Sequence, residues 1–283
     1  MQFREYRGYL GMISGNRTHL SSYLTGLLSS GRAVFSRDEA VRDLGSSPGA
    51  FLDAAERLQR RGHLVNVRQG FYVVVPPQYL SWGAPPPSWY VDDLMRHEGR
   101  PYYVGLLRAA ELHGASHQAV MEFQVVTDKK TPELHVGRSR IAFYYRKDME
   151  AVSAGIEDRK TDTGRMKVSS VELTALDLLR YPRAAGGIDH IATVLSDLGG
   201  KIDPEKLGGL SASFERSVVQ RLGHLLERVG HGDRSAPMFQ KLSEGKPPGW
   251  LELDRSEADL ELEPIERDHR WRVVVRRAPE VDE

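Results

Sequence analysis

The chain has 283 residues, of which 40% are hydrophobic, and its 39 basic residues balance its 39 acidic ones. This length suits two domains with a core each, and the zero net charge gives no whole-chain signal of a nucleic-acid or membrane partner. The absence of cysteine excludes disulfides, thiol catalysis and cysteine-ligated zinc or iron–sulfur sites. Because no apolar stretch is long enough to span a membrane and the N-terminus is polar, we expect a soluble, cytoplasmic protein.

Two helices are expected in the N-terminal part of the chain. The first spans Thr18–Gly31 and is capped by its threonine. The second occupies residues 37–44, because Ser36 and Glu39 have the spacing of a capping box, in which each side chain accepts a hydrogen bond from the other residue's amide. It should end at Gly45, since glycine readily adopts the positive φ that closes a helix.

A third helix and a β-hairpin come next. Ser47 can cap the helix, and Pro48 suits its first position, where no amide hydrogen is needed. The apolar residues of this helix follow the helical repeat: Phe51, Leu52, Ala55 and Leu58. Residues 64–75 then alternate with a period of two around a turn at Gln69-Gly70. Three helices followed by a hairpin are typical of a winged helix-turn-helix, so we predict that residues 1–77 form a DNA-binding domain.

The local charge supports this interpretation. The first eighty residues hold ten arginines, no lysine and six acidic residues, a net charge of +4. Arginine binds phosphate oxygens and guanine edges better than lysine, because its planar guanidinium group can donate two parallel hydrogen bonds. Double-stranded promoter DNA is therefore the predicted partner. The alternative is a small α+β module that binds a protein or has no partner.

In a winged helix the third helix lies in the major groove, with its N-terminal residues nearest the base edges. The residues assigned to the bases on this ground are Ser46, Ser47, Ala50, Asp53 and Arg57. Those assigned to phosphates are Arg37, Arg60 and Arg61, and those assigned to the adjacent minor groove or backbone, at the wing tip, are Arg68 and Gln69.

The remainder of the chain predicts a second, larger domain. Residues 78–90 are rich in proline and aromatic residues and indicate a stiff linker, which leaves residues 91–283 for the C-terminal domain. Helices are expected there at 92–98, 104–113, 170–181, 188–198 and 214–229, and strands at 121–127, 141–146, 165–168, 250–254 and 271–276. The fold class is therefore α+β, an N-terminal winged helix-turn-helix followed by a larger mixed α/β domain.

Charge is uneven in this second part. Residues 129–147 carry six basic side chains against one glutamate, which could extend the DNA footprint or guard a solvated strand edge. Residues 252–268 are strongly acidic and indicate a solvated loop or hairpin, with mimicry of nucleic acid as the alternative.

Taken together, the wing and the start of the second domain resemble a known family. The segments that carry the similarity are RRG at the end of the third helix, GFYVVVPP in the hairpin, and YYVGLLRAAELHG at residues 102–114, followed by a strand. This arrangement resembles the AbiE-type abortive-infection antitoxins of bacterial toxin-antitoxin systems, and the similarity covers nearly the whole chain. The resemblance implies a winged helix that represses its own operon at inverted repeats. It also implies a C-terminal domain that counters a co-encoded nucleotidyltransferase-like toxin in phage defence, without a stable complex between the two proteins.

The sequence contains none of the common motifs for nucleotide, zinc or acyl-transfer chemistry. His113 and His117 are four residues apart, but Gly114 between them interrupts the helix that would present both to a metal ion. We therefore expect a protein that is not an enzyme and that needs no metal or other cofactor.

Two alternatives to a repressor and antitoxin remain open. The residues Asp158 and Lys160 form a D-x-K pattern, which in a nuclease places a carboxylate on Mg²⁺ and a lysine near the scissile phosphate, with Asp148 or Glu150 as the further acidic ligand. A charged hairpin explains the same residues. The other alternative is a plain regulator whose C-terminal domain senses a small molecule.

Overall fold

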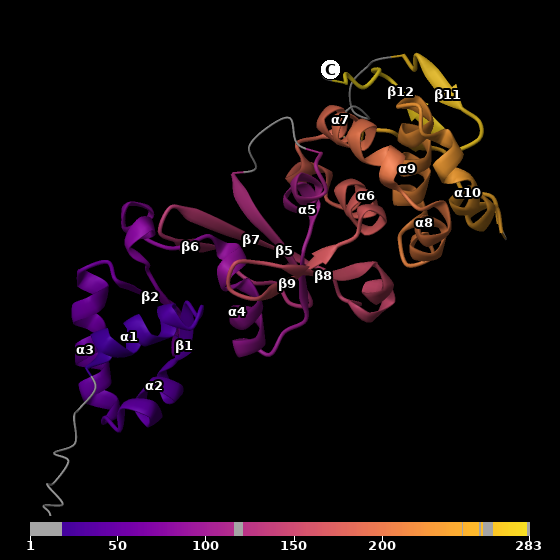
Figure 1. Ribbon diagram of the computed structural model, residues 1–283. Coiled ribbons are helices and arrows are strands. Elements are labelled where there is room, and N and C mark those ends of the chain that lie inside the picture. Colours follow the sequence, from indigo (N-terminus) through magenta and orange to yellow (C-terminus); the bar gives the residue numbers. More distant parts are fainter. Residues whose placement is uncertain (1–18, 116–120, 245, 255, 257–262, 282–283) are drawn as a thin grey trace, which may run out of the picture. The chain divides into compact units, whose positions relative to one another are not determined.

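The computed structural model describes residues 19–115, 121–244, 246–254, 256 and 263–281. The chain divides into two compact units, with the boundary between Pro85 and Pro86. Figure 1 labels the helices and strands of each unit along the chain. No described helix is long and apolar enough to cross a membrane.

The first unit is a winged helix. Its helices are α1 (Leu20–Ser29), α2 (Arg37–Leu44) and α3 (Pro48–Arg60), and its strands are β1 (Val34–Ser36), β2 (Leu64–Arg68) and β3 (Phe71–Val74). The strands form an antiparallel sheet in the order β1-β3-β2. β1 is a finding that the sequence did not predict, because three residues are too few for an alternating pattern. The proposed cap Thr18 lies outside the described residues.

Local hydrogen bonds fix the helix boundaries as expected. The Ser36 hydroxyl accepts from the Glu39 amide at 3.1 Å, and the Glu39 carboxylate accepts from the Ser36 amide at 3.3 Å, which confirms the capping box. Gly45 ends α2 with a φ of 57°. The Ser47 hydroxyl accepts from the Ala50 amide at 3.2 Å and caps α3. These contacts are satisfied within a few residues of sequence, which is why the sequence predicted them.

An aromatic cluster forms the core of the first unit. The rings of Phe35 and Tyr72 are stacked with their centroids 5.5 Å apart, and Phe51 meets both rings edge-on. Ala55 packs with them from one turn further along α3. The expectation that Leu52 belongs to this buried stripe is wrong, because its side chain is 46% exposed. The helical repeat turns Leu52 away from the side that Phe51 and Ala55 bury.

The chain between the two expected domains is not featureless. It forms two short 3₁₀ turns, η1 (Pro77–Trp82) and η2 (Pro87–Trp89), on either side of the boundary between the units. Each has proline at its start, where the fixed φ of the ring suits a tight helical turn.

A mixed six-stranded sheet organises the second unit. Its strands are β4 (Tyr102–Val104), β5 (Glu122–Thr127), β6 (Leu134–Val136), β7 (Ser139–Tyr145), β8 (Ile156–Lys160) and β9 (Arg165–Ser169). Their order is β6-β7-β5-β4-β9-β8, in which β5 with β7 and β4 with β9 are parallel and the other pairs are antiparallel.

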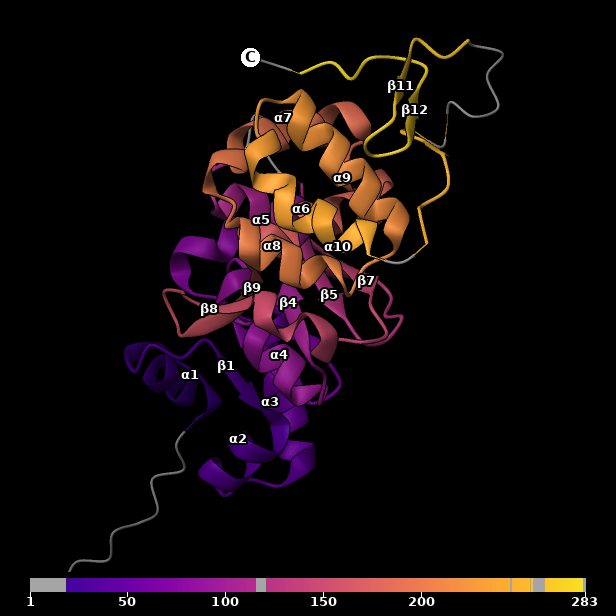
Figure 2. The same cartoon turned by 90° about the vertical axis from the view of Figure 1, so that its right-hand side faces the viewer.

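Helices and a small second sheet complete this unit. The helices are α4 (Val91–His97), α5 (Leu106–Leu112), α6 (Val171–Arg180), α7 (Ile188–Leu198), α8 (Pro204–Ser211), α9 (Arg216–Arg228) and α10 (Ala236–Ser243). The small sheet joins β10 (Leu251–Glu252), β12 (Val273–Val275) and β11 (Glu266–Asp268), in that order. Figure 2 shows α6 to α10 gathered into one group of helices within this unit. Strands β6, β8 and β11 and helices α8 and α10 had no distinct sequence signal.

The helix expected over residues 104–113 is confirmed as α5, but it starts later than expected because Val104 belongs to β4. β4 ends at Val104, and α5 starts only after Gly105, where a Cβ would lie 3.1 Å from the Tyr103 ring and from Val126. Leu106 takes a φ of 55°, so the chain turns sharply from strand to helix. The Gln124 side chain accepts from the Leu107 amide at 2.9 Å and so supports the new helix. This support comes from a neighbouring strand, so no local pattern could indicate it.

The main core of the second unit lies among its helices and extends to the small sheet. Trp271 is fully buried against α9, where Gly223 leaves room for its ring. Its indole nitrogen donates to the Glu227 carboxylate at 2.7 Å. A tryptophan far along the sequence is therefore part of the α9 packing.

Candidate functional site

The residues assigned to DNA on the third helix share one side of α3. Ala50, Asp53, Arg57, Arg60 and Arg61 are all exposed, while the opposite side is buried in the aromatic core. The first turn before Ala50 carries no bulky side chain, since Pro48 and Gly49 precede it. A helix of this shape can bring its N-terminal backbone close to a groove.

The arginines of this surface differ in how they are paired. Arg57 and Arg61 have no hydrogen-bond or ion-pair partner among the residues that the structure describes. Arg60 lies 2.5 Å from the Glu56 carboxylate one turn earlier, and Arg37 lies 3.2 Å from Asp38 at the start of α2. The guanidinium groups of Arg57 and Arg61 are therefore available to an anionic partner as they stand. Those of Arg60 and Arg37 would first have to exchange their carboxylate for a phosphate.

The two serines before α3 are placed differently. The Ser47 hydroxyl is occupied as the helix cap. The Ser46 hydroxyl is covered and has no hydrogen-bond partner in the described part of the chain, so it can reach DNA only if its side chain rotates. In the wing, Gln69 is exposed and Arg68 is half-buried next to a bulge in β2. The contacts of all these residues with DNA remain predictions.

Leu52 is also exposed on α3, but the helical repeat places it on a different side of the helix from Arg57 and Arg61. Its position off the Phe51–Ala55 stripe is the sequence signal that could have indicated this exposure.

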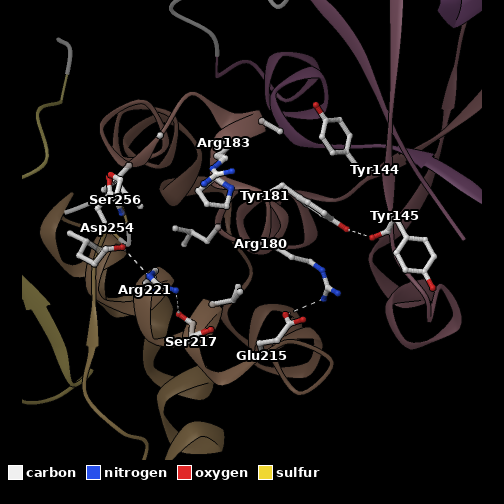
Figure 3. A pocket seen from close by; sticks show the side chains of 17 residues that line it. Tyr144, Tyr145, Arg180, Tyr181, Arg183, Glu215, Ser217, Arg221, Asp254 and Ser256 are labelled. Carbon is white, nitrogen blue, oxygen red and sulfur yellow. Dashed lines mark hydrogen bonds and ion pairs between the residues drawn. The ribbon is translucent and has the colours of Figure 1, made fainter. Parts of the chain in front are cut away.

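The second unit contains a pocket of about 980 Å³ that no sequence pattern marks (Figure 3). Figure 3 shows Arg180, Tyr181 and Arg183 in the middle of its lining, with Tyr145 to one side and Arg221 to the other. The Tyr181 hydroxyl donates to the Tyr145 carbonyl oxygen at 2.6 Å. The lining residues come from β7, α6, the 3₁₀ turn η4 (Pro182–Ala185), the start of α7, α9 and the chain after β10.

Among the six basic side chains at residues 129–147, those of Arg140 and Arg146 have partners within the second unit. Arg146 is only 3% exposed, donates to the Asp177 carboxylate at 2.9 Å and covers the Phe214 ring. The Tyr103 hydroxyl donates to the same carboxylate at 2.6 Å, and burial raises its pKa well above the usual value, so it remains a donor. Arg140 lies between two glutamates, at 2.9 Å and 2.7 Å. Arg146 is thus part of the core, whereas the ion pairs of Arg140 are open to solvent.

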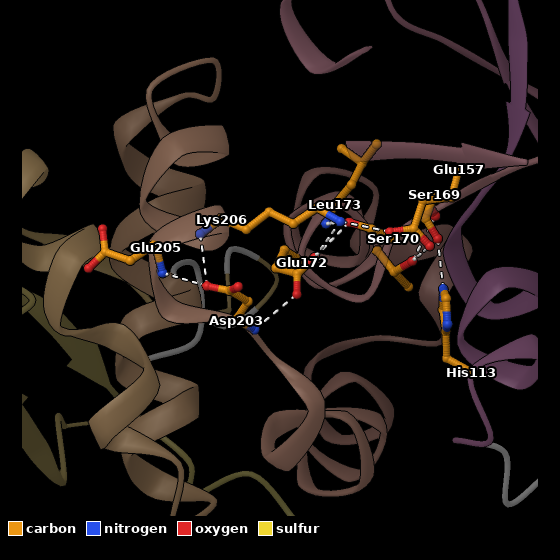
Figure 4. A network of polar contacts seen from close by, with 10 residues as sticks. His113, Glu157, Ser169, Ser170, Glu172, Leu173, Asp203, Glu205 and Lys206 are labelled. Atoms are coloured by element: carbon orange, nitrogen blue, oxygen red, sulfur yellow. Dashed lines mark hydrogen bonds and ion pairs between the residues drawn. The ribbon is translucent and has the colours of Figure 1, made fainter. Parts of the chain in front are cut away.

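A second buried carboxylate joins the sheet to the helices (Figure 4). Glu172 accepts from the Ser170 hydroxyl at 2.7 Å and from the Asp203 amide at 2.9 Å. Lys206 lies 3.5 Å from Glu172 and donates to Glu157 on β8 at 2.7 Å. These polar groups hold α6, α8 and the β8–β9 hairpin together.

The acidic stretch 252–268 also contributes to packing where it is described. Glu252 lies 3.0 Å from Arg276, and the Asp268 carboxylate lies 2.7 Å from Nδ1 of His224. Residues 255 and 257–262 of this stretch lie outside the described residues. Its two ends are strands β10 and β11 of the small sheet, rather than one solvated loop.

The D-x-K residues lie in an exposed hairpin. Asp158 and Lys160 stand on β8, opposite Lys167 and Arg165 on β9. The carboxylate of Asp148 accepts from the Ala151 amide at 3.0 Å. Within the described ranges there is no group of three histidine, aspartate or glutamate side chains placed to hold a metal ion. His117, the other half of the expected histidine pair, lies outside those ranges.

Comparison with known proteins bears on the second unit. Residues 103–228 match the family described as the AbiEi antitoxin C-terminal domain. This stretch is similar to that family. The AbiEi-type domain begins in β4, close to the segment on which the sequence resemblance rests, and ends with α9, so the expected antitoxin relationship is confirmed. Most of the residues that line the pocket lie within it.

The fold extends beyond the matched stretch. The chain is similar to the crystal structure of the RV2827C protein from Mycobacterium tuberculosis, with a TM-score of 0.65, 16% identity and 91% of each chain covered. At this identity the similarity shows a shared fold. The expected order of a winged helix followed by a larger mixed domain is thereby confirmed. No curated protein matches the chain.

Proposed function

We propose that this chain is a cytoplasmic antitoxin that represses its own toxin-antitoxin operon by binding promoter DNA. DNA binding is assigned to residues 1–77, and opposition to a nucleotidyltransferase-like toxin is assigned to residues 91–283, with residues 78–90 between them. The observation that carries the proposal is the combination of an AbiEi-type domain with a winged helix whose third helix presents Arg57 and Arg61 unpaired in the described chain.

On DNA, α3 would lie in the major groove and the wing would contact the adjacent backbone or minor groove. Arg57, beyond the N-terminal turns of the helix, is the side chain best able to bind a guanine edge with two hydrogen bonds. Arg61 is exposed at the C-terminal end of the same helix, where the groove wall and its phosphates come close. A module with a modest charge excess binds one half-site weakly, so inverted repeats and two copies of the chain would provide the needed affinity.

An electrophoretic shift with the protein's own promoter tests the first half of the proposal. Replacing Arg57 with alanine should weaken specific binding by about 1–3 kcal/mol. Arg60→Ala should instead lower affinity for all sequences and flatten the salt dependence, because it removes a phosphate contact. The matched control is Arg159→Ala, which removes an exposed arginine on β8 that has no partner in the described chain. If Arg57→Ala and Arg60→Ala both bind like the control, α3 is not the reading helix.

Growth rescue tests the second half. Expression of the full chain should protect cells from the toxin encoded next to it, and Arg57→Ala should still protect while losing repression of a promoter reporter. Mixing the two purified proteins should give no joint peak in size-exclusion chromatography. Failure of the wild-type chain to rescue growth would overturn the antitoxin assignment without touching DNA binding.

The nuclease alternative is tested separately with plasmid and a divalent metal ion. Cleavage that disappears in Asp158→Ala would contradict a repressor without catalytic activity. No contact around Asp158 or Lys160 in the described chain favours such a reaction.

A further inference from the structure

The pocket of the second unit has a lining that neither DNA binding nor the core explains. Its volume of about 980 Å³ is at the upper end of the range for sites that bind small molecules. Its lining combines apolar side chains, among them Leu179, Ile188 and Val218, with charged ones. An apolar lining with a few polar groups is the usual form of a ligand site.

Aromatic rings form one side of the pocket. The rings of Tyr144 and Tyr181 have their centroids 5.5 Å apart, and the hydrogen bond from the Tyr181 hydroxyl to the Tyr145 carbonyl holds this corner together. The Tyr145 side chain is exposed, unlike those of the other two tyrosines, which are half-buried. An exposed ring on a rigid strand provides a surface on which a planar heterocycle can stack.

Charged side chains surround the rest of the pocket: Arg180, Arg183, Arg221, Glu215 and Asp254. Hydrogen bonds to the carbonyl oxygens of Glu252 and Leu253 hold Arg221 in place. Arg180 lies 3.1 Å from Glu215, whose carboxylate is exposed, so this ion pair is screened by solvent and easily exchanged. Arg183 is exposed, follows shortly after α6, and has no polar partner among the described residues.

We propose that this pocket binds a nucleotide, with its base on Tyr145 and its phosphates at Arg183 and Arg180. Guanidinium groups match phosphate oxygens in geometry as well as charge. The carboxylates of Glu215 and Asp254 can accept hydrogen bonds from the sugar hydroxyls. An inorganic anion would leave the tyrosines unused, and an uncharged apolar ligand would leave Arg183 unpaired. A nucleotide has a base, phosphates and a sugar, so it can contact the tyrosine, the arginines and the carboxylates of the lining at once.

Calorimetric titration of the full chain with ATP, GTP, CTP and UTP tests this proposal. At least one of them should bind at a single site per chain, and more tightly than pyrophosphate or the matching nucleoside alone, because pyrophosphate lacks the base and the sugar and the nucleoside lacks the phosphates. If none binds at millimolar concentration, or if pyrophosphate binds as tightly as every nucleotide, the pocket is not a nucleotide site.

Two variants locate the binding. Arg183→Ala removes an exposed charged group and should weaken nucleotide binding roughly tenfold or more, in keeping with the loss of charge-assisted hydrogen bonds. Tyr145→Ala should weaken it by a similar factor through loss of stacking, while pyrophosphate binding stays the same. Arg159→Ala is the matched control and should leave affinity unchanged. Unchanged binding in both Arg183→Ala and Tyr145→Ala would overturn the proposal.

The proposal does not depend on promoter binding. Arg57→Ala, which lies in the first unit, should bind nucleotide like the wild-type chain. Thermal unfolding of Arg183→Ala and Tyr145→Ala should match that of the wild-type chain without ligand, and added nucleotide should raise the midpoint of the wild-type chain more than that of either variant. An equal rise in the variants would place the nucleotide elsewhere.

Discussion

The α3 surface of the first unit and the core of the second unit use charged residues in opposite ways. In the first unit, Arg57 and Arg61 are exposed on α3 and have no partner among the described residues. In the second unit, Arg146 and Asp177 are buried together, and Glu172 is buried among hydrogen-bond donors. The comparison shows that residue type alone does not separate a binding surface from a structural core. The partners of each charge and its exposure decide which role it has.

The largest effect is expected from breaking the buried pair. Asp177→Ala leaves Arg146 buried without its carboxylate, so it should destabilise the second unit by about 3–5 kcal/mol in urea unfolding. Promoter binding by the winged helix should persist where the chain is still folded, because the two units are separately compact.

The double change of Arg146→Met with Asp177→Leu is the control for this prediction. It removes both charges together, and its cost should be clearly smaller than that of Asp177→Ala. If Asp177→Ala lowers the free energy of unfolding by less than about 1 kcal/mol, the Arg146–Asp177 pair contributes no more than an ordinary surface ion pair.

A smaller but still clear loss is expected where packing is tight. A Cβ on Gly223 would overlap the ring of Trp271, so Gly223→Ala should destabilise the second unit by about 1–3 kcal/mol. Gly49 on α3 has no neighbour within 4 Å of its added Cβ, so Gly49→Ala should cost no stability. Thermal unfolding measures both. Equal losses of stability in Gly223→Ala and Gly49→Ala would contradict the tighter packing at Gly223.

The smallest effect concerns the paired arginine on the side of α3 that is proposed to face DNA. Glu56→Gln removes the carboxylate that holds Arg60, and because this ion pair is exposed the stability of the first unit should stay nearly unchanged. The freed arginine no longer has to exchange a carboxylate for a phosphate, so the affinity for DNA of any sequence should rise. Fluorescence anisotropy at several salt concentrations measures this affinity, and an unchanged affinity would show that Arg60 does not reach a phosphate.

The sequence predicted what short-range contacts determine. The capping box of Ser36 and Glu39 and the cap at Ser47 are satisfied within three residues, so the residue pattern alone locates α2 and α3. β4 was missed because its register is set by β5 and β9, which are distant in sequence. The burial of Arg146 was missed because its partner Asp177 lies on another element.

The same distinction applies to the candidate sites. The exposed side of α3 follows from helical spacing within one element, so the sequence predicts its residues. The pocket gathers Tyr145, Arg183 and Arg221 from three separate elements, and no spacing in the sequence connects them. Only the folded chain brings these residues together.

The most direct test of the central claim is the affinity of the full chain for its own promoter relative to shuffled DNA of the same length, at physiological salt. We expect the promoter to be bound about 10³-fold more tightly or better, and Arg57→Ala to lower this ratio while Arg159→Ala leaves it unchanged. Equal affinity for the two DNAs, or a ratio that Arg57→Ala does not alter, would contradict promoter recognition through α3.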